Sequence, residues 1–372
     1  MRRTSTRSVI YGWLRVFAVI ATLLAAPLAR CQSTSADQDP STDTTADSAY
    51  ETIRPVPIFS AGVAYNSFFD GGVDNVHPLV SPVTLIPFGQ NWLIESRETF
   101  EINLAPVPGE SGYHGALQKE VDYLQLDYIA NSHMTVTVGR FLTPFGVFNE
   151  RLYPVWIRDL QTDPLILPIA TGPSGAGTGA MVRGGFDLTS KVEINYATYF
   201  STLSTDTPLD SERMAGMRAG IFLTGPRLEF GGSFQHLLQG DRSNAFGFHA
   251  AWQPRSLPLD LRAEYARADT GSGYWVESAY KLSQIPVWRD ELRHVQVVGR
   301  MQQYFTGVVP DDDLPAVNTR LFEFGLNYYF YDDLRIVSSY GRQFAPEGGN
   351  MNIWNVGLTY RFVLPIGHGD IQ

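Results

Sequence analysis

The amino-acid sequence predicts an all-β fold, a transmembrane antiparallel β-barrel. From about residue 179 to residue 362, apolar and polar side chains alternate in segments of about ten residues. Gly, Pro, Asn and Asp separate these segments, as they do at turns. The last segment places these apolar side chains on one face of a strand: Trp354, Val356, Leu358, Tyr360 and Phe362. Such a repeat puts lipid on one side of the sheet and water on the other.

Two further observations favour a barrel over a helical membrane protein. Beyond the N-terminal region, no apolar run reaches the 18 residues or so that a membrane-spanning helix needs. The mean hydropathy is −0.11, close to neutral, as expected when half of each strand faces water. A soluble secreted β-protein would also alternate, but its connections would not sort into tight turns and long loops.

The N-terminal residues 1–31 predict a signal peptide for export. A short apolar run, 16–28, follows a positively charged region that contains Arg2, Arg3, Arg7 and Arg15. Cleavage is expected before Gln32. Residues 28–31 also have a faint likeness to a lipoprotein cleavage site, so lipidation or removal of Cys31 is left open. The barrel region contains no cysteine, which leaves no disulfide there.

Composition predicts how the next segment behaves and which partners are excluded. Residues 32–54 are rich in Ser, Thr and Asp and predict a short disordered periplasmic tail. The chain carries 28 basic and 38 acidic residues, and removal of five arginines with the signal peptide leaves a net charge of −15. This acidic balance argues against a nucleic-acid partner.

Alternation and turn residues place the barrel at 55–362. Counting from Trp92 gives fourteen strands, and the segments 55–67 and 79–88 add a pair. We expect sixteen strands, with fourteen as the alternative because the segment 79–88 is rich in proline. Sixteen strands enclose an aqueous channel, whereas eight are filled by their own side chains.

The connections between these strands mostly alternate between tight and long. Tight turns are expected at 131–132, 189–190, 225–226 and 332–333, and long loops at 142–178, 202–213 and 305–318. This asymmetry is typical of outer-membrane barrels, which have short periplasmic turns and longer extracellular loops. The last strand then ends in the periplasm, and residues 363–372 form a periplasmic C-terminal tail.

The longest connection, 142–178, predicts a pore constriction. It contains Trp156, Leu160 and Ile166, which need a surface to pack against, and the barrel lumen offers one. A loop folded into the lumen would narrow the pore. The candidate constriction residues are Arg151, Arg158, Asp159 and Asp163 on the loop, with Arg183 and Arg218 on the facing wall.

One segment of the chain resembles a known family. Residues 139–146 read Gly-Arg-Phe-Leu-Thr-Pro-Phe-Gly and are similar to the G-x-F-x-x-P-F-G segment of the phosphate-selective porins O and P, within the wider outer-membrane porin superfamily. The resemblance implies a sixteen-stranded trimeric porin with an inward-folded constriction loop. The strict members of that family line the pore with a ladder of arginines and a cluster of lysines.

Strand parity predicts a lumen of mixed charge in this chain. The lumen-facing bases are Arg97, Arg183, Arg218, Arg262, Lys281, Arg300, Arg335 and Arg361. The lumen-facing acids are Glu95, Glu101, Asp127, Glu193, Glu229, Asp260, Glu264, Glu277 and Glu323. A ring of one sign would set ion selectivity, so this mixture predicts weak selectivity or a transverse field across the pore. The alternative is that these charges pair to satisfy one another.

These features predict an outer-membrane porin for passive diffusion of small hydrophilic solutes or ions. The expected partners are outer-membrane lipid or lipopolysaccharide and the solutes themselves. A non-conducting barrel for adhesion or assembly is the first alternative, and a hydrolase built around His236 and Ser243 is less favoured. The histidines lack the spacing of metal ligands, and no glycine-rich nucleotide loop is found, so no cofactor is expected.

Overall fold

The computed structural model describes the backbone of residues 58–70, 73–107, 109–171, 175–206, 209–240, 242–309, 313–346 and 350–365, all within the unit Ile53–Gln372. The predicted signal peptide 1–31 and tail 32–54 lie outside the described residues. Of the predicted C-terminal tail, residues 363–365 continue the last strand and the remainder lies outside the described part.

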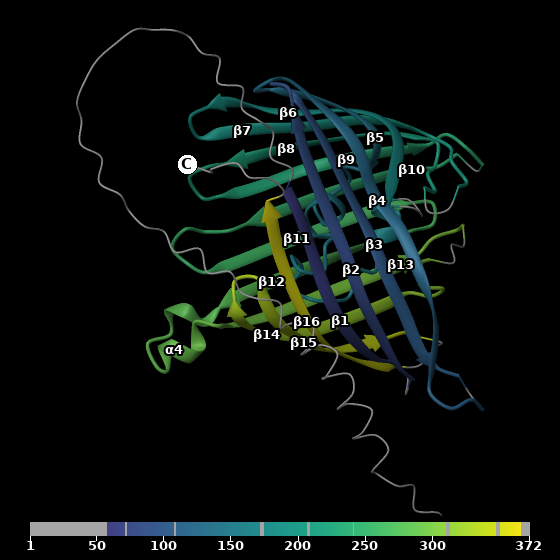
Figure 1. The fold of residues 1–372 in the computed structure, drawn as a ribbon, viewed down its shortest axis with the longest axis vertical. Helices are drawn as coiled ribbons and strands as arrows, with labels where there is room; N and C mark the ends of the chain where they lie inside the picture. Colours follow the sequence, from purple (N-terminus) through teal and green to yellow (C-terminus); the bar gives the residue numbers. More distant parts are fainter. Residues whose placement is uncertain are drawn as a thin grey trace, which may run out of the picture. The chain divides into compact units, whose positions relative to one another are not determined.

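The described chain forms one antiparallel sheet, which confirms the prediction of an all-β fold (Figure 1). Its strands are β1 (Ile58–Asp70), β2 (Val73–Phe88), β3 (Trp92–Pro106), β4 (Tyr113–Asn131), β5 (Met134–Leu142), β6 (Ala176–Thr189), β7 (Val192–Thr202), β8 (Met214–Leu223), β9 (Leu228–Leu237), β10 (Asn244–Trp252), β11 (Leu259–Ala268), β12 (Gly271–Lys281), β13 (Val295–Thr306), β14 (Thr319–Tyr331), β15 (Leu334–Phe344) and β16 (Met351–Pro365).

Each strand pairs with the next along the chain, and β1 pairs with β16 to close the barrel. The proline-rich strand β2 lies between β1 and β3, and its register with β3 skips residues 77–78 and 81–82. Pro78 and Pro82 have no N–H to donate, so the ladder is interrupted there without ending the strand.

Short helices occur only in connections of the described chain. Helices α2 (Phe148–Leu152) and α3 (Leu167–Thr171) lie between β5 and β6, while η1 (Leu282–Gln284) and α4 (Arg289–Leu292) lie between β12 and β13. None of the described helices is long and apolar enough to cross a membrane.

Connection lengths differ from the expected asymmetry at two positions. The connection 282–294 carries η1 and α4 although it lies at the end of the barrel that has the tight turns, and α4 projects at the left of Figure 1. At the opposite end, β11 and β12 are joined by the tight turn 269–270. Loop length is only a tendency in such barrels, and these two connections depart from it.

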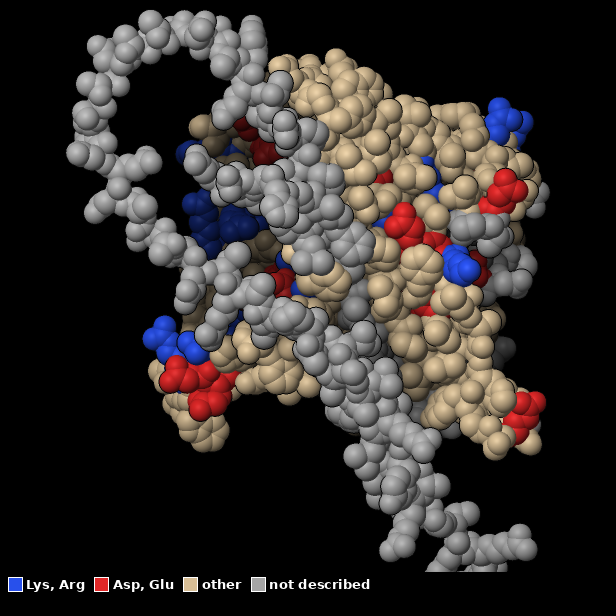
Figure 2. Space-filling view, in the orientation of Figure 1, with Lys and Arg blue, Asp and Glu red and all other residues tan. Residues whose placement is uncertain are grey.

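The pattern of exposure is inverted relative to a soluble protein. Along β14, Phe322, Phe324 and Leu326 are exposed, while the alternate residues Glu323 and Asn327 are buried. Figure 2 shows that uncharged residues cover most of the described surface in this view, with charged side chains in separate groups. An apolar exterior and a polar interior are what a barrel that spans a membrane requires.

A charge on this apolar exterior should destabilise the barrel. Phe324 is at the middle of β14 and its side chain is 57% exposed on the outer face. We expect Phe324→Arg to lower the free energy of unfolding by about 2–4 kcal/mol, because the charge would enter the bilayer core. Urea titration of the barrel refolded in lipid bilayers would measure this.

The matched control is Val308→Arg, since Val308 is 95% exposed in the connection 307–318 and should tolerate a charge. Equal stability of the two variants would contradict the assignment of this face to lipid.

Candidate pore constriction

The connection 143–175 between β5 and β6 folds into the barrel lumen. Its described residues form hydrogen bonds with side chains of β8, β9, β11, β13, β14 and β15. We call residues 143–175 the constriction loop. The loop therefore follows the inner wall from β8 to β15, a path that the sequence analysis did not specify.

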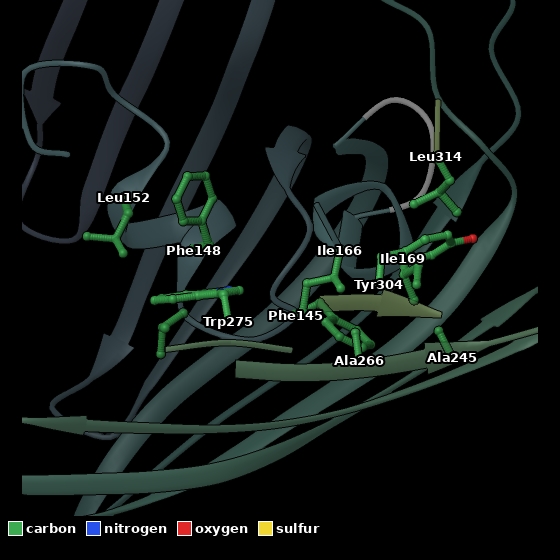
Figure 3. Close-up of a cluster of buried hydrophobic side chains, with 11 residues drawn as sticks. Phe145, Phe148, Leu152, Ile166, Ile169, Ala245, Ala266, Trp275, Tyr304 and Leu314 are labelled. Carbon is green, nitrogen blue, oxygen red and sulfur yellow. The ribbon is translucent and has the colours of Figure 1, made fainter. Parts of the chain in front are cut away.

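Apolar side chains attach the loop to this wall. Phe145, Phe148 and Ile166 of the loop are each at most 2% exposed. They pack in one cluster with Trp275 of β12 and Tyr304 of β13, and the smaller Ala245 and Ala266 make room for them (Figure 3). Burial of each large side chain contributes about 1.5–3 kcal/mol.

Two glycines of the segment 139–146 have a geometric role. Gly146 has φ +62°, and a Cβ there would lie 2.0 Å from the Glu264 carboxylate. Gly139 has φ +124°, and a Cβ there would lie 2.4 Å from the Leu124 carbonyl oxygen. Both positions therefore exclude a side chain, which explains why this segment carries glycine at its two ends.

Side chains of β9 and β11 hold the first turn of the loop. The N–H groups of Val147 and Phe148 donate to Glu264 at 3.1 and 3.3 Å, and the N–H of Gly146 donates to Ser233 at 3.0 Å. These donors precede or begin α2 and have no partner within that helix. A buried carboxylate is thus used to satisfy loop backbone.

Ion pairs fix the middle of the loop. Arg151 donates two hydrogen bonds to Glu229, at 2.6 and 2.8 Å, and Arg218 pairs with Glu150. A bidentate pair of this kind fixes orientation as well as charge.

Further along the loop, Asp159 lies 3.3 Å from Arg262. Arg300 donates to Glu277 at 2.6 Å and to the Thr162 carbonyl at 2.7 Å. Wall arginines therefore bind both wall acids and loop carbonyls.

The electrostatic environment on the loop follows from this pairing. Hydrogen bonds to Glu229 raise the pKa of the Arg151 guanidinium, so it stays charged. Burial raises the pKa of the Asp159 carboxyl, and the neighbouring Arg262 and Arg335 oppose that rise. Burial also raises the pKa of the Tyr153 hydroxyl, which stays neutral.

Two spaces lie on the other side of the loop, against β2 to β6. A cavity of about 330 Å³ is bounded by His77, Ser81, Arg97, Thr99 and Glu101 of the wall and by loop residues including Tyr153, Trp156, Arg158 and Asp163. A smaller space of about 160 Å³ is lined by residues that include Glu95, Glu150 and Arg183.

A stacked contact crosses between the loop and β3. The guanidinium of Arg97 lies 4.9 Å from the ring centre of Tyr153 and 5.9 Å from that of Trp156. Asp122 accepts a hydrogen bond from Arg97 at 2.7 Å and neutralises it. The loop is therefore held to both walls, and the lumen is narrowed from two sides.

The structure separates the six predicted constriction residues into two groups. Arg158 and Asp163 line the larger space and pair at 2.5 Å, and Arg183 lines the smaller one, 3.5 Å from Asp127. Asp159 and Arg218 differ from the expectation: they are buried between loop and wall and hold the loop in place. Arg151 pairs with Glu229 on that same side.

The predicted lumen-lining residues also fall into groups. The following are buried or half-buried on the inner side: Arg97, Asp127, Glu193, Glu229, Arg262, Glu264, Arg300 and Glu323. Lys281 and Arg361 keep the inward parity of β12 and β16, but they lie at strand ends and are exposed. Lys281 lies over the Tyr329 ring at 4.6 Å, and Arg361 pairs with Asp333 at 3.1 Å across a turn.

Sequence reasoning missed the apolar docking surface for the loop. Trp275 and Tyr304 are large aromatic residues at inward positions of β12 and β13, where a wet lumen favours polar side chains. These two aromatic residues at inward positions were the feature of the sequence that could have indicated where the loop packs. In the described part of the chain, no group of three or more His, Cys, Asp or Glu residues is placed to hold a metal ion.

Comparisons with known proteins show the same fold at low sequence identity. The loop L8 deletion mutant of OmpT, an outer membrane protein of Vibrio cholerae, is 10% identical with a TM-score of 0.55 over 83% of this chain and 100% of that chain. Salmonella typhi OmpF, in a complex with daunomycin, is 10% identical, with a TM-score of 0.53 over 82% of this chain and 97% of that chain. An anion-selective porin from Comamonas acidovorans is 10% identical, with a TM-score of 0.51 over 82% of this chain and 99% of that chain. No protein-family model and no curated protein matches the sequence.

Removal of Glu229 should loosen the constriction loop. In Glu229→Ala, Arg151 loses both carboxylate hydrogen bonds, and because Arg151 is partly exposed we expect a local loss of only about 1–2 kcal/mol. Hydrogen–deuterium exchange of the amides of 148–152 should become faster. The control Glu193→Ala removes an acid on β7 and should leave these amides unchanged. Unchanged exchange in Glu229→Ala would contradict the anchoring role.

Proposed function

We propose that this chain is an outer-membrane porin through which small hydrophilic solutes or ions diffuse passively. The observation that carries the proposal is the constriction loop, which is fixed along β8 to β15 and leaves polar space against β2 to β6. A loop that narrows a barrel with a charged interior limits solute size without requiring a chemical step. Porin-type barrels among the solved structures of the same fold support this reading.

The charges around the remaining space favour weak ion selectivity. Arg97 is neutralised by Asp122, and Arg158 is neutralised by Asp163. Arg183 is likewise paired, 3.5 Å from Asp127, and the acids Glu95 and Glu101 also border these spaces. All three of these arginines are thus paired with acids, so the substrate preference of phosphate-selective porins is not carried over from the resemblance of residues 139–146. A homotrimer remains part of the proposal, and one solved structure of Vibrio cholerae OmpT is described as a trimer form.

A non-conducting barrel is the second candidate, because one observation favours it. The Arg97 stack on Tyr153 and Trp156 ties the loop to the wall opposite its anchors, as expected if the lumen were plugged. A hydrolase has less support. His236 lies 2.9 Å from Asn244, but among the described residues no serine hydroxyl is hydrogen-bonded to His236.

Single-channel recording separates these candidates. The full-length chain, refolded and inserted into a planar bilayer, should give stable conductance steps. With a salt gradient the reversal potential should stay close to zero, because the lining charges are mixed. A folded barrel without conductance would remove the porin proposal and favour a role in adhesion or assembly.

Truncation of one loop aromatic should widen the pore. Trp156 lines the larger space, so Trp156→Ala should increase single-channel conductance while the barrel stays folded. The matched control is Trp288→Ala, because Trp288 is 76% exposed in the connection 282–294 and lies outside the lining set. An unchanged conductance in Trp156→Ala would show that the current does not pass between the loop and β2–β3.

A further inference from the structure

Three arginines on the outer face of the barrel form a row at one end. Across the outward positions of β6 to β16, the charged residues are Arg267, Arg320 and Arg342. Arg267 is near the end of β11, Arg320 is the second residue of β14, and Arg342 is near the end of β15. All three therefore lie at the barrel end that carries the constriction loop. We call them the arginine row.

Each arginine of the row has a polar, uncharged side chain opposite it on a neighbouring strand. Arg267 is opposite Ser272, Gln303 is opposite Arg320, and Arg342 is opposite Asn352. Arg342 donates to Asn352 at 2.5 Å and lies 5.7 Å from the Phe344 ring centre, so its guanidinium is oriented. Within the described residues, no carboxylate forms an ion pair with any member of the row.

An apolar groove adjoins the arginine row. It has a volume of about 910 Å³, and its lining includes Phe246, Phe248, Tyr265 and Phe305, with Arg267 at the same site. Residues 307–309 of the next connection also line it, as does Asp269 of the turn after β11. A second space of about 460 Å³ lies beside Phe305 and is lined by Arg320 and Phe344. Apolar surface thus lies next to unpaired positive charge, on a face that meets lipid.

We propose that the arginine row binds the phosphate groups of an anionic glycolipid in the outer leaflet, with an acyl chain along the groove. Three strand spacings and a register offset of two residues separate the Cα atoms of Arg267 and Arg320, a distance of roughly 16 Å that two long arginine side chains can shorten to reach two phosphates carried at opposite ends of a disaccharide. Arginine is the side chain best matched to phosphate geometry. This site is separate from the lumen and does not depend on whether the channel conducts.

The charge pattern favours a lipid over a contact between the β6–β16 faces of two copies of the chain. The outward faces of β6 to β16 carry no acidic residue, so those faces of another copy offer no partner for the arginine row. A lipid with phosphates supplies the negative charge, and its acyl chains match the aromatic surface. One lipid molecule would then contact both the arginine row and the apolar groove.

The test compares lipid binding by the full-length refolded chain with that of two triple variants. One variant is Arg267→Gln, Arg320→Gln and Arg342→Gln. The control variant, Arg255→Gln, Arg289→Gln and Arg293→Gln, removes the same charge from exposed sites at the opposite end. Calorimetric titration in dodecyl-maltoside micelles would use diphosphoryl lipid A, the same molecule without phosphates, and phosphatidylglycerol as probes.

Each arginine at an anionic lipid surface contributes roughly fivefold to binding, so we expect the row variant to bind diphosphoryl lipid A about 100-fold more weakly. The control variant should bind as the unmodified chain does, and the dephosphorylated lipid should bind weakly to all three. Equal binding by the row and control variants overturns the proposal. So does equal affinity for phosphatidylglycerol, which would indicate charge attraction alone. A changed oligomeric state in the row variant, with lipid binding intact, would assign the surface to a contact between copies.

Discussion

The constriction loop depends on a single constraint, that its backbone groups must find hydrogen-bond partners on the barrel wall. A loop inside a barrel has no neighbouring strand, yet buried N–H and C=O groups must be paired. The wall supplies both kinds of partner. Ser233, Glu264 and Gln302 accept from loop N–H groups, while Arg300, Asn327 and Arg335 donate to loop carbonyls.

This constraint explains why the lumen carries charges of both signs. Each residue of backbone brings one donor and one acceptor, so a wall made of a single charge could satisfy only half of them. The wall charges that remain are then paired with each other, as Arg300 and Glu277 are at 2.6 Å. A buried charge without a partner is costly, and pairing removes that cost. The total charge of the lumen is therefore a poor guide to ion selectivity, because many of these charges hold the loop and others are paired with one another.

The sequence was sufficient to predict the parts of the fold that follow from alternation. Side chains in a strand alternate faces, so the inward position of Glu229 or Arg300 could be assigned from parity alone. Parity cannot say which side of the constriction loop such a residue contacts. Arg218 was therefore assigned to the opening, although it lies beneath the loop. Asp159 is on the loop itself, where parity gives no guide, and it faces Arg262 of the wall. Connection 282–294 was also beyond prediction, since no principle requires a turn at that end to be short.

The inner and outer faces of the barrel differ in whether their charged side chains form ion pairs. Inside, charges are numerous and paired, so they fix structure and leave a small field. Outside, the few charges of β6 to β16 are of one sign, lie at one end and have no paired carboxylate among the described residues. Pairing is the usual fate of a charge that only stabilises the fold, as Arg361 and Asp333 illustrate at 3.1 Å. The outer arginines gain nothing from the protein itself beyond local orientation, so their counter-charge must come from what surrounds the barrel.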